Sequence, residues 1–239
     1  MPTLYIVHLD RHHLGDDLFL KSLAQQLAKG QSGEPACLFV HGSGEKVERT
    51  LEAQGYFPER SEGVLEVETD EQRRLVERSV REMNQEIVAT LTDEVVSTVG
   101  IQGVDRGLLA QDSDGQVTVT NTGWIEALLK QRVVPVVSAL VETDGVVQEV
   151  WDADVVSAFV AAVGESFDPV PCVLTTGDVA GVPGPDGPQN EATAEAAASV
   201  VADADALHRI AEAADRVLVT NLTGLLSGEE PTGTFVTAD

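Results

Sequence analysis

The sequence predicts an α/β fold, a three-layer α/β/α sandwich around a mainly parallel central sheet. Short runs that are apolar throughout alternate along the 239 residues with segments of helical periodicity. Strands of this kind are buried on both faces, as in sheets that helices cover on either side. Turn signals between some neighbouring strands also indicate hairpins, so we expect a mixed sheet within one domain, residues 1–239.

The N-terminal part of the chain alternates regularly between the two kinds of segment. Strands are expected at 4–7, 36–40, 64–67 and 95–99. Helices are expected at 16–29, 46–54 and 70–91. The second of these helices stops before Gly55, a typical helix terminator.

The C-terminal part contains more turns. Hairpin material at 116–119 precedes a short helix at 125–130, and a strand at 133–141 turns through 143–145 into a strand at 146–150. A helix at 153–163 and a buried strand at 171–175 follow. The segment 182–189 contains three prolines and is expected to be a loop. An alanine-rich helix at 191–214 and strands at 216–220 and 234–236 complete the prediction.

The charge of the chain excludes some classes of function. Forty acidic residues against 15 basic ones give a net charge of -25, which would repel a nucleic-acid backbone. No apolar run reaches the ~18–20 residues of a membrane span, and two cysteines within apolar runs suit a reducing cytoplasm. With four lysines against eleven arginines, the composition indicates a halophilic protein; the alternative is an ordinary acidic enzyme.

Three segments could bind a ligand. Gly42, Ser43 and Gly44 lie between a strand and a helix, where glycines let an anion approach free N–H groups, although a tight turn that binds nothing has the same pattern. Asp152 and Asp154 open a helix, where one could be the N-cap and both could orient cations. The segment 175–182 follows the carboxyl end of a strand, where open α/β sheets bind ligands.

Other familiar kinds of site have little support. His12 and His13 are adjacent and no helical His-x3-His occurs, so we expect no metal site. Ser43 and Ser138 lack a His–Asp context, which argues against a hydrolase triad.

The motifs taken in order resemble the amino acid kinase family, and within it the N-acetylglutamate kinases. The similarity runs over about 36–182, and its serial order is more specific than any single motif. The matching stretches are 38–44 (LFVHGSG), 83–88 (MNQEIV), 99–105 (VGIQGVD), 133–140 (VVPVVSAL), 144–145 (DG), 152–154 (DAD), 174–182 (LTTGDVAGV) and 233–236 (GTFV).

The resemblance implies an activity and a set of roles. Such kinases phosphorylate an N-acyl amino-acid carboxylate with ATP and Mg²⁺ in arginine biosynthesis. A substrate lobe would span about 1–165 and a nucleotide lobe about 166–239, and a homodimer is expected. By resemblance, Gly42, Ser43, Gly44 and Asp152 bind substrate, Asp154 organises the catalytic lysines, and Thr175, Thr176, Asp178 and Gly181 bind the nucleotide.

The chain departs from the family at charged positions. His8 stands where the first-strand lysine would be, followed by Asp10 and Arg11 in place of two glycines. The second lysine segment reads 201–209 without a lysine and ends at Arg209. Either His8, Arg11 and Arg209 replace the lysines, since phosphoryl transfer needs positive charge, or the chain is an inactive paralogue that senses a ligand.

Overall fold

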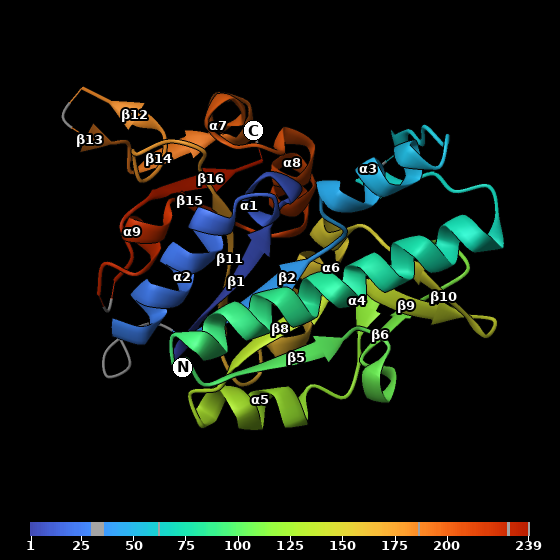
Figure 1. The fold of residues 1–239 in the computed structure, drawn as a ribbon. Coiled ribbons are helices and arrows are strands. Elements are labelled where there is room, and N and C mark those ends of the chain that lie inside the picture. Colours follow the sequence, from blue (N-terminus) through green and yellow to red (C-terminus); the bar gives the residue numbers. More distant parts are fainter. Residues whose placement is uncertain (30–35, 62, 186, 229, 239) are drawn as a thin grey trace.

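An eight-stranded sheet forms the centre of the molecule (Figure 1). The computed structural model describes residues 1–29, 36–61, 63–185, 187–228 and 230–238. Within this sheet, as far as the described residues form it, all neighbouring strands are parallel except the pair β15–β16. The order across the sheet is β14 (Glu191–Thr193), β16 (Thr234–Thr237), β15 (Val217–Thr220), β11 (Asp168–Leu174), β1 (Thr3–Leu9), β2 (Ala36–His41), β8 (Val134–Ser138) and β5 (Thr98–Gln102).

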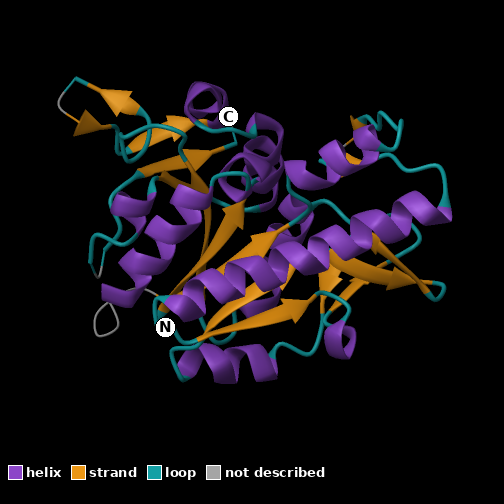
Figure 2. Cartoon of the chain, viewed as in Figure 1, coloured by secondary structure: helices purple, strands orange, loops and turns teal. Residues whose placement is uncertain are grey.

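Helices cover both faces of the sheet, which confirms the three-layer prediction (Figure 2). Successive side chains of a strand point to opposite faces, so Leu4 and Ile6 join one apolar cluster while Tyr5 and Val7 join the other. The first cluster includes α5 (Gly123–Lys130), α6 (Asp152–Val163) and α8 (Ala204–Ala213). The second includes α2 (Asp17–Lys29), α4 (Asp70–Asp93) and α9 (Leu222–Leu225).

The longest helix, α4, has 24 residues and begins with a capping box. The Thr69 hydroxyl accepts the Gln72 N–H at 3.2 Å, and the Gln72 side chain accepts the Thr69 N–H at 3.0 Å. One face of α4 is buried and the other carries charged residues. Within the described ranges, no helix is both long enough and apolar enough to cross a membrane.

Short elements connect this framework. In the described part of the chain four hairpins lie outside the sheet, and a third apolar cluster packs α3 against α4 and two of these hairpins. The helical pieces are α1 (Arg11–Leu14), α3 (Glu45–Ala53), η1 (Asp105–Gly107), α7 (Ala194–Ala197) and η2 (Ala198–Val200). The hairpins are β3 (Arg60–Ser61) with β4 (Val64–Leu65), β6 (Leu109–Gln111) with β7 (Val117–Val119), β9 (Leu140–Thr143) with β10 (Val146–Glu149), and β12 (Pro183–Gly184) with β13 (Gly187–Pro188).

The structure differs from the predicted elements in four places. The strand expected at 95–99 starts at Thr98, because Val95 has a φ of 65° in the turn that ends α4. The strand expected at 133–141 breaks at Ala139, whose N–H bonds His41 O, and β9 then pairs with β10 instead. The single helix expected at 191–214 is divided into β14, α7, η2 and α8, with Asp203 as a new N-cap. The loop expected at 182–189 contains the short hairpin β12–β13.

Candidate functional site

A cavity of about 220 Å³ lies where the carboxyl ends of β1 and β2 meet the first turns of α6 and α8. This edge of a parallel sheet is where open α/β folds bind ligands. The lining residues are Asp10, Arg11, Ser43, Arg60, Gly63, Glu149, Asp152, Ala202, Asp203, Ala204 and Asp205. The sequence had drawn attention to Arg11, Ser43 and Asp152, which the fold brings together here.

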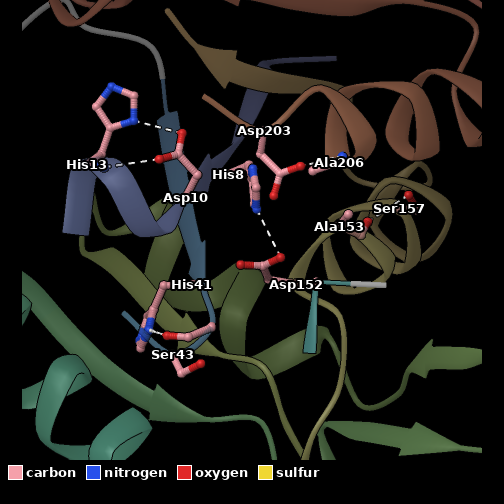
Figure 3. A network of polar contacts seen from close by, with 12 residues as sticks. His8, Asp10, His13, His41, Ser43, Asp152, Ala153, Ser157, Asp203 and Ala206 are labelled. Carbon is pink, nitrogen blue, oxygen red and sulfur yellow. Dashed lines mark hydrogen bonds and ion pairs between the residues drawn. The ribbon is translucent and has the colours of Figure 1, made fainter. Parts of the chain in front are cut away.

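His8 supplies a positive charge beside this cavity. It lies near the end of β1 with its side chain 1% exposed, and its Nε2 is 3.0 Å from Oδ1 of Asp152 in the first turn of α6 (Figure 3). Burial alone would lower the pKa of His8, but the charge of Asp152, helped by the charges of Asp10 and Asp203, raises it to about 9. Burial acts upward on the pKa of Asp152, yet the His8 charge holds it below its ordinary value. Both shifts act in the direction of the ionised pair.

Asp10 fixes the turn that follows β1. Its carboxylate caps α1 by accepting the N–H groups of His12 and His13 at 2.9 and 3.0 Å, and it also bonds the His13 ring at 2.8 Å (Figure 3). Although its burial acts in the opposite direction, these contacts and His8 lower the pKa of Asp10. Asp10 and Arg11, which stand where the resemblance places two glycines, thus belong to a capped helical turn whose Arg11 side chain reaches the cavity.

The His41 side chain stabilises the 42–44 loop through hydrogen bonds. Its Nδ1–H donates to Gly42 O at 2.9 Å, and its Nε2 accepts from the Asn84 amide at 3.0 Å. Burial lowers the pKa of His41 to about 4, so this ring is neutral at pH 7. A Cβ at Gly42 would lie 2.7 Å from Oε1 of Glu149 and 3.1 Å from Oδ2 of Asp152, so glycine is needed for these carboxylates to approach.

The Ser43 N–H is occupied by a carboxylate. It donates to Oε1 of Glu149, the last residue of β10, and Glu149 also lines the cavity. Burial of the carboxyl raises the pKa of Glu149 to about 7, with the Asp152 charge acting in the same direction. The Ser43 N–H and Arg60 oppose this rise. Among the described residues, the other oxygen, Oε2, is buried without a hydrogen-bond partner.

Arg60 is a site residue that the sequence analysis did not identify. Its guanidinium donates to Ser43 Oγ at 3.1 Å and to Gly63 O at 2.5 Å, and its Nε pairs with Glu48. Arg60 therefore links the 42–44 loop to α3 and to the β3–β4 hairpin. Its position in a two-residue strand with no motif around it explains why only the packed structure reveals it.

Of the other two predicted cationic residues, Arg11 lies at the cavity and Arg209 lies outside its lining. Arg11 lines the cavity and lies 3.6 Å from Glu48. Arg209, on α8, instead pairs at 2.6 Å with Asp154 on α6 and does not belong to the cavity lining. His8 and Arg209 therefore each pair with a carboxylate in the first turn of α6.

The predicted nucleotide loop lies outside the cavity lining and bonds both within itself and to neighbouring segments. Thr175 Oγ1 donates to Val179 O at 3.1 Å, and the Thr176 N–H donates to Val200 O at 3.0 Å. Asn221 donates to Asp178 O at 2.8 Å, and Gly181, at a φ of 118°, lies close to Thr234. These residues are absent from the lining of the cavity.

Negative charge predominates in the cavity. Five carboxylates line it, from Asp10, Glu149, Asp152, Asp203 and Asp205, against the guanidinium groups of Arg11 and Arg60. In the described ranges no three His, Cys, Asp or Glu side chains are grouped so that they could hold a metal ion. A phosphate ligand would therefore depend on His8 and the arginines, and on the cation that it brings with it.

Comparison with known proteins identifies the family of this chain. The sequence model of the amino acid kinase family matches residues 8–194. Acetylglutamate kinase of Chloroflexus aurantiacus is 30% identical over 174 residues, which cover 67% of this chain and 66% of that protein. The chain thus spans just under two thirds of the length of this curated relative.

Solved structures resemble the whole chain at low identity. N-acetylglutamate synthase from Neisseria gonorrhoeae, solved with coenzyme A and N-acetyl-glutamate, gives a TM-score of 0.68 at 18% identity, covering 99% of this chain and 60% of that one. The protein smu.665 from Streptococcus mutans UA159 gives 0.66 at 17% identity, covering 99% of both chains. Likeness at this level establishes the fold, which does not by itself define an activity.

Proposed function

The chain belongs to the amino acid kinase family, and from this premise we propose that it transfers a phosphoryl group from ATP to a small acidic molecule bound in the cavity. The observation that carries the proposal is His8. At the position where the resemblance places a lysine, this histidine is buried 3.0 Å from Asp152, whose charge raises its pKa. Phosphoryl transfer needs positive charge at that point more than it needs acid–base chemistry.

In the proposed reaction, a substrate carboxylate oxygen attacks the γ-phosphorus of ATP. The bond between that phosphorus and the β,γ-bridging oxygen breaks, and ADP leaves with the electron pair. His8, with its orientation set by Asp152, would stabilise the charge on the transferring oxygens, while Arg60 would hold the 42–44 loop in place. Mg²⁺ would enter as part of the nucleotide substrate.

We propose N-acetylglutamate as the first substrate to test, because the curated relative is named acetylglutamate kinase. The nucleotide would bind over the C-terminal lobe, about 166–239, through Thr175, Thr176, Asp178 and Gly181. Arg209 and Asp154 would connect that lobe to α6. A homodimer, a cytoplasmic location and adaptation to salt belong to the same proposal.

A second function is favoured by a separate observation. Arg11 and Arg60 both pair with Glu48, and Arg209 pairs with Asp154, so these guanidinium groups already have carboxylate partners. A protein of this kind could bind a small molecule without transferring phosphate, as a ligand-sensing subunit.

One experiment separates the two functions. ADP release is measured in molar KCl with ATP, Mg²⁺ and either N-acetylglutamate or other small acids, and ligand binding is followed in parallel by calorimetry. For the kinase we expect turnover that falls ~10³-fold in His8→Ala and is retained in His8→Lys, with His12→Ala as the exposed control. Binding of an acid without ADP release in the folded protein would favour the sensor.

A further inference from the structure

The contact between Glu149 and the 42–44 loop determines what this loop can bind. The Ser43 N–H is the donor that such a loop would offer to an oxyanion, and Oε1 of Glu149 already accepts it. Gly42 leaves room for this carboxylate, because a Cβ at position 42 would lie only 2.7 Å from Oε1 of Glu149. Glu149 therefore stands where a carboxylate or phosphate group of a ligand would bind.

We propose that Glu149 is a specificity-determining residue that excludes small oxyanions from the Ser43 N–H unless its own carboxyl is protonated or displaced. This inference rests on the proposed function only in taking the 42–44 loop as part of the ligand site. When ionised, Glu149 competes for the donor and repels the anion. When neutral, it carries an O–H that can itself donate to an oxyanion.

The charges around Glu149 set the pH range of this exclusion. The charge of Asp152 on α6 raises the pKa of Glu149, and the charge of Arg60 on β3 lowers it. Asp10 and Arg11 of α1, and Asp203 and Asp205 next to and within α8, line the same cavity. With a pKa of about 7, Glu149 changes charge while His8, at about 9, remains protonated up to pH 8.

Two buried groups support the assignment to Glu149. Within the described residues, Oε2 of Glu149 has no donor, so the carboxylate is incompletely satisfied at this place. The neighbouring His41 is neutral at pH 7 and its ring nitrogens bond Gly42 O and Asn84, so it adds no charge to the loop. Glu149 thus remains the group beside Ser43 that changes charge near pH 7.

Sulfate is the appropriate probe because its charge does not change between pH 6 and 8. If it binds only while Glu149 is neutral, its apparent Kd rises about tenfold between these values, following the protonated fraction of a group of pKa about 7. Titration is followed by calorimetry and by the Ser43 amide signal in NMR, at constant molar KCl. The unsubstituted protein alone gives this result, so the test does not depend on a variant that folds.

Variants then assign the effect to Glu149. In Glu149→Ala we expect sulfate to bind about tenfold more tightly at pH 8 than in the unsubstituted protein, and in Glu149→Gln the pH dependence should be lost. Glu142→Ala, an exposed glutamate of the same hairpin, should behave as the unsubstituted protein. The inference is overturned if sulfate affinity is equal at pH 6 and 8 or if Glu149→Ala binds no more tightly. Neither result depends on ADP release, which tests the proposed function separately.

Discussion

The His8–Asp152 pair should make the stability of the protein fall as the pH rises above neutrality. The pKa of His8 is raised from 6.5 to about 9 in the folded protein, where the ring is fully buried. Between these pH values the folded state holds a proton that the unfolded state has released. The stabilisation is therefore complete below pH 6.5 and is lost as the pH rises through 9. At ~1.4 kcal/mol per pH unit, it amounts to about 3 kcal/mol.

Urea unfolding in molar KCl at pH 6.5, 8 and 9.5 measures this dependence. The matched variant is His8→Gln, whose side chain does not titrate, so the difference between the two proteins isolates His8 from Glu149 and other groups. We expect the difference in unfolding free energy to shrink by about 3 kcal/mol between pH 6.5 and 9.5. A difference that stays constant across this range would refute the assignment of a charged His8. The ring signals of His8 in NMR provide a second check, with a midpoint expected near pH 9.

Two further predictions concern positions around the site. Gly63→Ala should destabilise the protein more than Gly55→Ala, although both glycines have a positive φ, because only at Gly63 would the added Cβ lie 2.1 Å from Trp151. In thermal unfolding we expect a loss of stability of about 1 kcal/mol for Gly55→Ala, and ~1–3 kcal/mol more than this for Gly63→Ala. Equal losses in the two variants would contradict the close approach of Trp151 to Gly63. Asp154→Asn should change stability by less than about 1 kcal/mol, since its partner Arg209 is 48% exposed, but should reduce turnover if the pair organises the kinase site; unchanged kinetics would assign the pair to structure alone.

The central strands β1, β2 and β11 were predictable because they are apolar on both faces. Leu4 to Val7 pack alternately into the two helix layers, so the run of apolar residues is itself the evidence for a doubly covered strand. The wrong element predictions lie where the secondary-structure propensity of the residues differs from the conformation that the fold requires. Val95 suits a strand by composition, yet it occupies the turn after α4, and the alanines after 191 suit one helix, yet Asp203 caps a new one.

The site was predictable only where residues follow strands in a known order. His8 lies near the end of β1 and Asp152 opens α6, and these two elements pack against each other in the first apolar cluster. Arg60 and Glu149 come from hairpins, whose positions depend on packing against α3 and α4 rather than on local pattern. A glutamate at the end of a strand three residues before Asp152 was the signal available for Glu149. The roles assigned to Thr175, Thr176, Asp178 and Gly181 stay predictions.

The acidic character of the chain has two opposite effects on the site. A lysine at the end of β1 would start from an ordinary pKa about four units above that of histidine, whereas the pKa of the buried His8 is raised by Asp152, Asp10 and Asp203 around it. The same carboxylates raise the cost of bringing an anion into the cavity, and Glu149 adds to that cost whenever it is ionised. The same carboxylates thus favour the positive charge that phosphoryl transfer requires and repel the phosphate group. Whether the chain acts as a kinase therefore depends on the balance of charge within this cavity rather than on the absence of the lysines alone.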